Sequence, residues 1–277
     1  MTVILKKSVL ILLKIIIVPS LAAVAVWTAF HIVGGEMVRV YQGPSIWAWL
    51  GGVLGRFDFG MAGEWMTSGQ KAAPYLWQGI RNTGLIALTA ISLASLFSIA
   101  WTYLVWNNPY NAGIRVVSGL LRFFSSWPIL IGAIFVAVII KAPAFTTLIM
   151  PAIILAICDN NLNDFRDNLM DEIKEVMQSD YAIAALGQGR SFFRNLVPEI
   201  FWKVISFIAS RLPAVVSGII VLELYFNING IYQYLMMFYR ARDLNAILGI
   251  TFLVSFCLTA WSSIFAVVYS IIDPRQR

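Results

Sequence analysis

Residues 180–189, with the sequence DYAIAALGQG, form a short, helix-favouring insert between two strongly apolar segments. Ala184 and Ala185 give such a helix a small, flat surface. Gly189 can end or turn the helix, because glycine adopts the required φ at little cost. A short helix of this kind, lying parallel to a membrane, can fit into a groove of another protein. On these residues alone, the alternative is a generic amphipathic cytoplasmic helix.

The flanking segments belong to a chain of 277 residues that is 60% hydrophobic and only 12% charged. A soluble domain carries about twice that charged fraction. Apolar runs of about 20 residues recur, and that length spans a bilayer as a helix. Their continuity excludes the alternating pattern of a membrane β-barrel. We therefore expect an all-α polytopic membrane protein with six spans, at Val9–Val33, Thr83–Trp106, Val116–Ile140, Ala144–Cys158, Phe201–Phe226 and Ala246–Ile272.

The distribution of basic residues predicts the orientation of these spans. With both termini inside, the cytoplasmic segments hold eleven Lys and Arg residues and the outer segments hold seven. The positive-inside rule therefore favours cytoplasmic termini. The first apolar run exceeds the length of a signal-peptide core, so we expect it to be retained as a span. The net charge of +6 is scattered over loop ends, which does not indicate a nucleic-acid partner.

The chain is expected to form one transmembrane domain over residues 1–277. Residues 1–82 would supply the first span and a long outer loop, in which Ser45–Leu54 reads as a short interfacial helix. Residues 83–277 would supply a core of five spans with a cytoplasmic loop at 159–203. No Gly or Pro interrupts this loop from Asn160 to Leu186, so it can be helical. Trp127-Pro128 predicts a kink in the third span.

The order of motifs around the insert resembles the dipeptide/oligopeptide/nickel group of ABC importer permeases. The motifs that carry this resemblance are FDFGMAGEWMTSGQKAAPYLWQGIRNTGLIAL at 57–88, TLIMPAIILAI at 147–157, DYAIAALGQGRSFFR at 180–194, SGIIVLELYF at 217–226, NGIYQYL at 229–235, RARDLNAILGI at 240–250 and YSIIDPRQR at 269–277. The chain departs from the family at Ile183, where a basic residue is common, and in its very short outer segment between spans three and four.

The resemblance implies a bacterial inner-membrane protein with the type I importer permease fold. It implies that a coupling helix between spans four and five docks onto an ATPase. The residues that the resemblance assigns to this docking are Asp180, Tyr181, Ala184, Ala185, Gly187 and Gly189. The implied partners are a second homologous permease, two cytoplasmic ATPase subunits, an extracytoplasmic solute-binding protein and the lipid bilayer. ATP and Mg²⁺ would bind to the ATPase subunits, so no cofactor is expected on this chain.

Two charged residues within the fifth apolar segment are candidates for the transport path. Arg211 could line a pore or form a structural ion pair near the inner end, and Glu223 could line an outer gate or make a structural hydrogen bond. A single histidine and two separate cysteines do not indicate a metal site. The chain has no G-x-x-x-x-G-K-[ST] phosphate loop, so we expect no ATPase site of its own.

Three functions follow from these observations. The first is an importer permease for short peptides or similarly sized solutes. The second is an ABC-type exporter, or a permease for a metal chelate or other non-peptide solute. The third, from a different class, is a membrane scaffold or sensor subunit that transports nothing.

Overall fold

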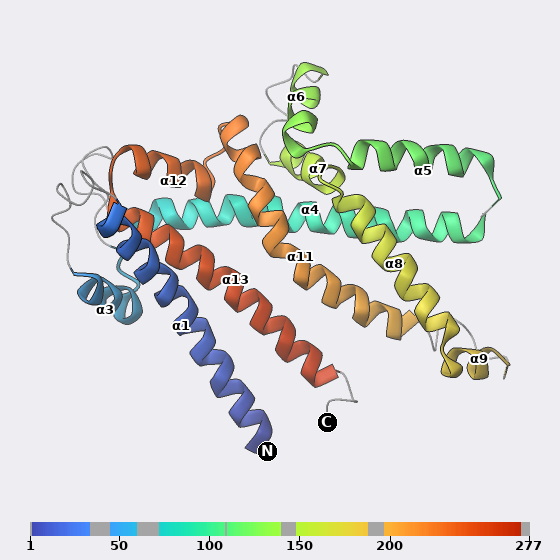
Figure 1. The fold of residues 1–277 in the computed structure, drawn as a ribbon, viewed down its shortest axis with the longest axis horizontal. Coiled ribbons are helices and arrows are strands. Elements are labelled where there is room, and N and C mark those ends of the chain that lie inside the picture. Colours follow the sequence, from blue (N-terminus) through green and yellow to red (C-terminus); the bar gives the residue numbers. More distant parts are fainter. Residues whose placement is uncertain are drawn as a thin grey trace. The chain divides into compact units, whose positions relative to one another are not determined.

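The computed structural model describes residues 2–33, 45–59, 72–108, 110–139, 148–187 and 197–272, and all regular secondary structure in these ranges is helical. The expected all-α class is therefore confirmed (Figure 1). The helices are α1 (Thr2–Val33), α3 (Ile46–Arg56), α4 (Ala73–Asn107), α5 (Ala112–Ser125), α6 (Ile129–Ile139), α7 (Ile149–Ile157), α8 (Asn161–Gln178), α9 (Asp180–Gly187), α11 (Val197–Tyr225), α12 (Ile231–Arg240) and α13 (Leu244–Ile272).

Within the described residues, four helices are long and apolar enough to cross a membrane: α1, α4, α11 and α13. They correspond to the first, second, fifth and sixth expected spans. A fifth crossing results if the bent pair α5–α6 counts as one span. The fourth expected span is described only from residue 148 onward. Its helix α7 has nine residues, or about 14 Å of length, less than half of a bilayer core. The total of six spans stays a prediction.

The third expected span, Val116–Ile140, is not one helix. Helices α5 and α6 meet at an angle of 105° across residues 126–128. Pro128 precedes the first residue of α6, and its carbonyl oxygen accepts hydrogen bonds from Ile131 N and Gly132 N. Proline is well tolerated at a helix start but cannot continue the preceding helix, since it lacks an N–H donor. The predicted kink therefore lies in the right place but is much sharper than expected.

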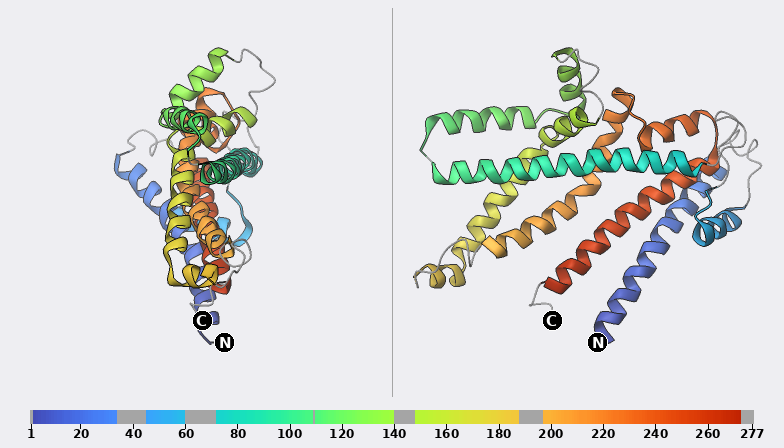
Figure 2. Two further views of the ribbon diagram at one scale, coloured as in Figure 1. Left: turned by 90° about the vertical axis from the view of Figure 1, so that its right-hand side faces the viewer. Right: turned by 180° about the vertical axis from the view of Figure 1, so that it is seen from behind.

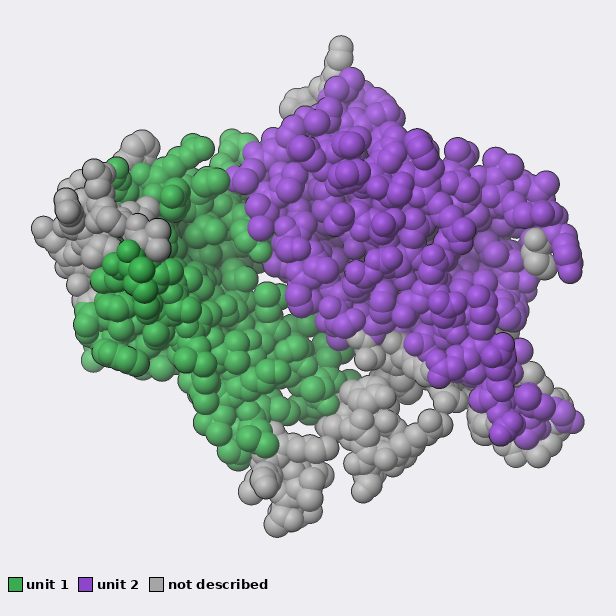
Figure 3. Space-filling model, viewed as in Figure 1, with its two compact units in different colours: residues 1–84, 227–268 green, residues 85–226, 269–277 purple. Residues whose placement is uncertain are grey.

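The chain divides into two compact units, coloured separately in Figure 3. Unit 1 comprises residues 1–84 and 227–268, and unit 2 comprises residues 85–226 and 269–277. Helix α4 contributes its first residues to unit 1 and the rest to unit 2. The proposed docking segment and both charged candidates of the fifth span belong to unit 2.

Unit 1 packs α1, α3, the start of α4, α12 and α13 around one apolar core. Its fully buried large side chains include Phe59, Leu76, Ile231 and Leu248. Ser45 caps α3, because its hydroxyl accepts a hydrogen bond from Ala48 N at 3.4 Å. The short helix expected over Ser45–Leu54 is thus confirmed as a helix, and its Trp49 and Leu50 side chains are buried in the unit 1 core.

Unit 2 holds the elements that lead to α9. Helix α5 runs alongside the second half of α4 (Figure 1), and Trp101 Nε1 donates to Ser118 Oγ at 3.1 Å between them. Helices α6, α7 and α11 approach closely at Gly218. A Cβ at this position would lie 2.6 Å from Ile129 Cδ1 and 3.0 Å from Leu155 Cδ1. The absence of a side chain at Gly218 therefore lets three helices pack together.

Candidate functional site

Helix α8 is amphipathic and packs against four neighbouring helices. Its buried residues recur at helical spacing, namely Leu162, Phe165, Arg166, Leu169 and Val176. Helix α8 contacts α5, α7, α9 and α11, and its Leu169 and Val176 side chains belong to one buried cluster with Ala182 of α9. The opposite face holds exposed polar residues such as Asp171 and Glu175. The helix is therefore fixed along one side while its other side remains open.

Ser179 separates α8 from α9. Its hydroxyl donates to the carbonyl oxygen of Val176 at 2.7 Å and accepts from Ala182 N at 3.3 Å. The same side chain thus satisfies the end of one helix and the start of the next, which is the capping role that serine often has. The loop was expected to be helical from Asn160 to Leu186, and the structure adds this break.

Helix α9 lies at the end of α8 that is remote from α7 (Figure 2). Ala182 is fully buried against Leu169 and Val176, with Ile173 and Val204 beside them. This small side chain holds α9 against α8 and α11.

The expected docking residues, unlike Ala182, are either exposed on α9 or have side chains outside the described residues. Asp180, Ala184 and Gly187 are exposed, and so is Ile183, at 61% of its surface. The backbones of Tyr181 and Ala185 belong to α9, but their side chains lie outside the described residues, as does all of Gly189. The described part of α9 therefore offers a face of small and apolar side chains.

An ion pair fastens the first turn of α8 to α11. The guanidinium of Arg211 contacts the Asp164 carboxylate, and both side chains are partly exposed. The Arg211 guanidinium also lies 5.3 Å from the centre of the Phe207 ring, within cation–π range. Phe207 in turn meets Phe165 of α8 edge-on at 5.2 Å between ring centroids. Arg211 of α11 thus links this helix to the first turn of α8.

Glu223 occupies a different part of α11. Its side chain has no exposed surface. Twelve residues separate it from Arg211, which corresponds to about 18 Å along a helix. The structure therefore does not bring the two candidate pore or gate residues into one site.

Two motifs from distant parts of the sequence meet in unit 1. Thr83 Oγ1 accepts a hydrogen bond from Ile231 N at 2.9 Å, and Asn82 Nδ2 donates to the Asn229 carbonyl oxygen at 2.8 Å. The Tyr234 hydroxyl donates to Gln78 Oε1 at 3.1 Å. We call this group of contacts the α4–α12 joint. Its members appear in the motifs at 57–88 and 229–235, but sequence reasoning did not pair them.

Tyr234 also shows the electrostatic effect of this packing. Burial, and secondly the nearby Tyr75, raises the pKa of the Tyr234 hydroxyl above its usual range. The hydroxyl is protonated at neutral pH, as tyrosine ordinarily is, and the raised pKa keeps it a hydrogen-bond donor in the joint at more alkaline pH as well. Helix α12 lies outside the membrane-spanning helices.

The architecture defines the class of protein: a multi-pass helical membrane protein with a helical insert before its penultimate long apolar helix. Residues 169–277 match the family described as the binding-protein-dependent transport system inner membrane component. The matched region contains the end of α8 together with α9, α11, α12 and α13. The resemblance to ABC importer permeases is thereby confirmed.

The names of two similar proteins are consistent with this family. The chain is 30% identical over 139 residues to a Brucella abortus protein named as a peptide transport system permease, an alignment covering 47% of this chain and 42% of the relative. It is 21% identical over 243 residues to a nickel import system permease protein of Staphylococcus aureus, covering 83% of this chain and 72% of the relative. The match to the first of these relatives thus spans less than half of that protein's length.

Proposed function

We propose that this chain is a permease subunit of an ATP-driven importer and forms half of a translocation path. The observation that carries the proposal is the arrangement of α9. A short helix exposes Ile183, Ala184 and Gly187, and is held from behind by the buried Ala182. Such a surface fits a groove in a partner, and the family match to residues 169–277 supports an ATPase as that partner.

In this mechanism, α9 receives the movement of the ATPase and α8 transmits it to the spans. ATP binding draws two ATPase subunits together, and each carries a docked helix with it. The Asp164–Arg211 ion pair and the Phe165–Phe207 contact then pass the displacement from α8 to α11. A second, homologous permease supplies the other half of the path. The two halves switch between inward- and outward-facing states, a rigid-body domain motion.

Direction and energy come from partners in this proposal. The two states differ in stability with and without ATP, and ATP hydrolysis on the partner subunits resets the cycle. An extracytoplasmic solute-binding protein delivers the solute. We propose a short peptide or a solute of similar size, such as a metal chelate, since the relatives are named for peptide and nickel transport. The termini lie in the cytoplasm of this inner-membrane protein.

The docking role can be tested by placing bulk on the exposed side of α9. Ala184→Trp should block the groove contact without disturbing the fold, because position 184 is exposed. In the reconstituted complex we expect solute uptake and solute-stimulated ATPase activity to fall at least tenfold. Met236→Trp is the matched control, since Met236 is also exposed but lies on α12, on the predicted outer side. Full transport by the Ala184→Trp complex would show that α9 is not the docking helix.

Two alternative functions predict different outcomes in the same complex. An exporter of the same design would move the solute across the membrane in the opposite direction, and it would need no binding protein. A scaffold or sensor subunit would leave ATPase activity independent of this chain. ATP-dependent uptake that requires both the chain and a solute-binding protein would refute both alternatives.

A further inference from the structure

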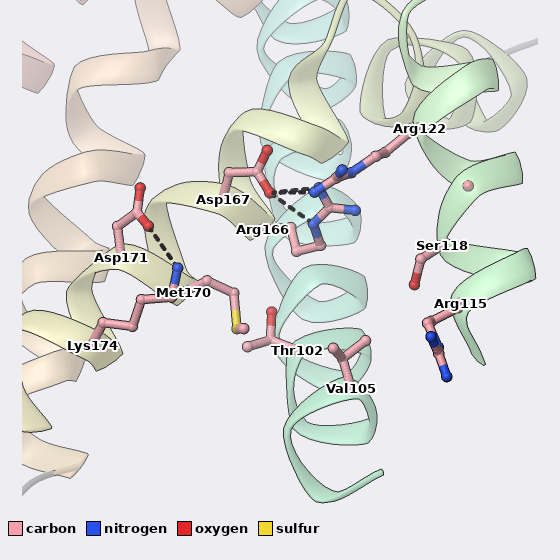
Figure 4. Close-up of a pocket in the computed structure, with 11 residues that line it drawn as sticks. Thr102, Val105, Arg115, Ser118, Arg122, Arg166, Asp167, Met170, Asp171 and Lys174 are labelled. Atoms are coloured by element: carbon pink, nitrogen blue, oxygen red, sulfur yellow. Dashed lines mark hydrogen bonds and ion pairs between the residues drawn. The ribbon is translucent and has the colours of Figure 1, made fainter. Parts of the chain in front are cut away.

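Unit 2 contains a cavity of about 590 Å³ beside α8. Three helices line it: α4 with Thr102 and Val105, α5 with four residues, and α8 with five (Figure 4). This volume lies within the range of small-ligand sites. The cavity is separate from the exposed face of α9, and the proposed docking mechanism does not use it.

The cavity carries an excess of positive charge. Four cationic side chains line it, namely Arg115, Arg122, Arg166 and Lys174, against the two carboxylates of Asp167 and Asp171. The net charge of the lining side chains is therefore +2. Part of the charge is already paired, because Asp167 accepts from the buried Arg166 at 2.9 Å and Lys174 lies 3.3 Å from Asp171. The remaining excess comes from the side of α5.

Helix α5 presents its polar face to this cavity. Arg115, Ser118, Gly119 and Arg122 are spaced at i, i+3, i+4 and i+7, so they form one face of the helix. The Arg115 guanidinium donates to the Tyr110 carbonyl oxygen at 3.1 Å, and Arg122 lies 3.8 Å from Asp167 with two thirds of its side chain exposed. Both guanidinium groups therefore keep donors for a further anion.

Two hydroxyl-bearing residues, Thr102 and Ser118, belong to the wall of the cavity. Thr102 is 2% exposed, and its Oγ1 has no hydrogen-bond partner within the described part of the chain. Because this oxygen atom is buried, a ligand in the cavity does not reach it. The hydroxyl that can donate to a ligand is that of Ser118, whose Oγ accepts from Trp101 Nε1 and so keeps its own hydrogen to donate. Guanidinium groups, an ammonium and a hydroxyl donor together suit a tetrahedral oxyanion.

We propose that this cavity binds a phosphate-bearing anion, supplied either by the headgroup of an acidic phospholipid or by a soluble phosphate compound. A neighbouring face of α5 favours the lipid source. It exposes Val116, Leu120 and Phe123, beside which an acyl chain can lie while the headgroup enters the cavity. The bound anion would bridge α5 and α8, and so would stiffen the helix that carries α9.

The test measures binding to the purified full-length chain, without ATPase subunits, so its outcome is independent of the docking proposal. Dioleoylphosphatidylglycerol is added in neutral detergent and counted by native mass spectrometry, with dioleoylphosphatidylcholine as the zwitterionic comparison. In a second arm, labelled inorganic phosphate is measured by equilibrium dialysis at constant ionic strength. The cavity variant is Arg115→Gln/Arg122→Gln. The matched control is Arg56→Gln/Arg240→Gln, which removes two exposed arginines in unit 1.

We expect the cavity variant to bind phosphatidylglycerol about 25-fold more weakly, at about fivefold for each arginine, while the control is unchanged. The same pattern for inorganic phosphate, with no preference for phosphatidylglycerol, would assign the site to a soluble ligand. Gly119→Phe checks the result without a charge change, because a Cβ at Gly119 meets no atom within 4 Å and the ring can fill the cavity. Equal binding of both anions by the wild type, both cavity variants and the control would overturn the proposal.

Discussion

The Gly79→Ala substitution in α4 is the most direct test of the α4–α12 joint. A Cβ added at this position would lie 3.0 Å from Tyr234 Cδ2, 3.1 Å from Ile231 Cα and 3.2 Å from Ile231 N. Two of these three atoms are backbone, so they cannot rotate away. The Gly79→Ala substitution must therefore push the start of α12 outward. Doing so stretches the hydrogen bond from Ile231 N to Thr83 Oγ1.

The expected change in the free energy of unfolding is the sum of one favourable and two unfavourable effects. Alanine favours a helix interior over glycine by about 1 kcal/mol. Overpacking of a tight contact costs about 1–3 kcal/mol, and loss of the buried hydrogen bond costs about 1 kcal/mol more. Gly79→Ala should therefore destabilise unit 1 by about 1–3 kcal/mol. Gly84→Ala, five residues further along the same helix, meets no atom within 4 Å and should be neutral or stabilising by up to about 1 kcal/mol.

The assay is equilibrium unfolding of the full-length chain in mixed micelles with increasing sodium dodecyl sulfate, monitored by far-ultraviolet circular dichroism. The two variants should differ by about 1–4 kcal/mol in their free energies of unfolding, with Gly79→Ala less stable than the wild type and Gly84→Ala at least as stable. If both glycine-to-alanine changes stabilise the chain equally, α12 does not pack against Gly79, and the joint as described is wrong.

Two further predictions concern polar contacts. Asp243 Oδ1 accepts a hydrogen bond from Ala246 N at 3.1 Å at the start of α13, so Asp243→Ala should lower the free energy of unfolding by about 1 kcal/mol, whereas Asp243→Asn should retain most of the cap. Equal losses in the two variants would argue against capping. Asp164 and Arg211 should show a coupling energy of about 1 kcal/mol in a double-mutant cycle of Asp164→Asn and Arg211→Gln, because both side chains are partly exposed. This coupling should shrink at high ionic strength, and additive single-variant effects at low salt would contradict the pair.

The apolar periodicity of the chain was sufficient to predict its long helices. The expected spans Phe201–Phe226 and Ala246–Ile272 correspond to α11 and α13 with starts shifted by four and two residues. Helix α4 instead begins ten residues before the expected Thr83. Its extra turns are helical because Leu76 and Gly79 pack against α12 and α13, as the short distances at Gly79 and Gly249 show. Such tertiary stabilisation leaves no mark on a hydropathy pattern.

The contacts of the candidate site were harder to predict. A structural ion pair was one of two readings of Arg211, but its partner Asp164 lies 47 positions earlier, among many other acidic residues of the same loop. The cavity was missed for a different reason. The spacing of Arg115, Ser118 and Arg122 was visible in the sequence, yet reading residues 116–140 as one apolar span hid the polar face of α5. The sharp turn at Pro128 is what separates the two helices.

The dimensions of α8 have a mechanical consequence. Its 18 residues give a rigid rod about 27 Å long, anchored near one end by Asp164 and joined to α9 at the other. Rotation of this rod by only 10° about its anchored end displaces the far end by about 5 Å, close to one helical turn. If the proposed function is correct, a displacement of several ångströms at the ATPase end of α8 would produce only a small tilt of α11. Even a small tilt of α11 would disturb its close packing with α6 and α7 at Gly218.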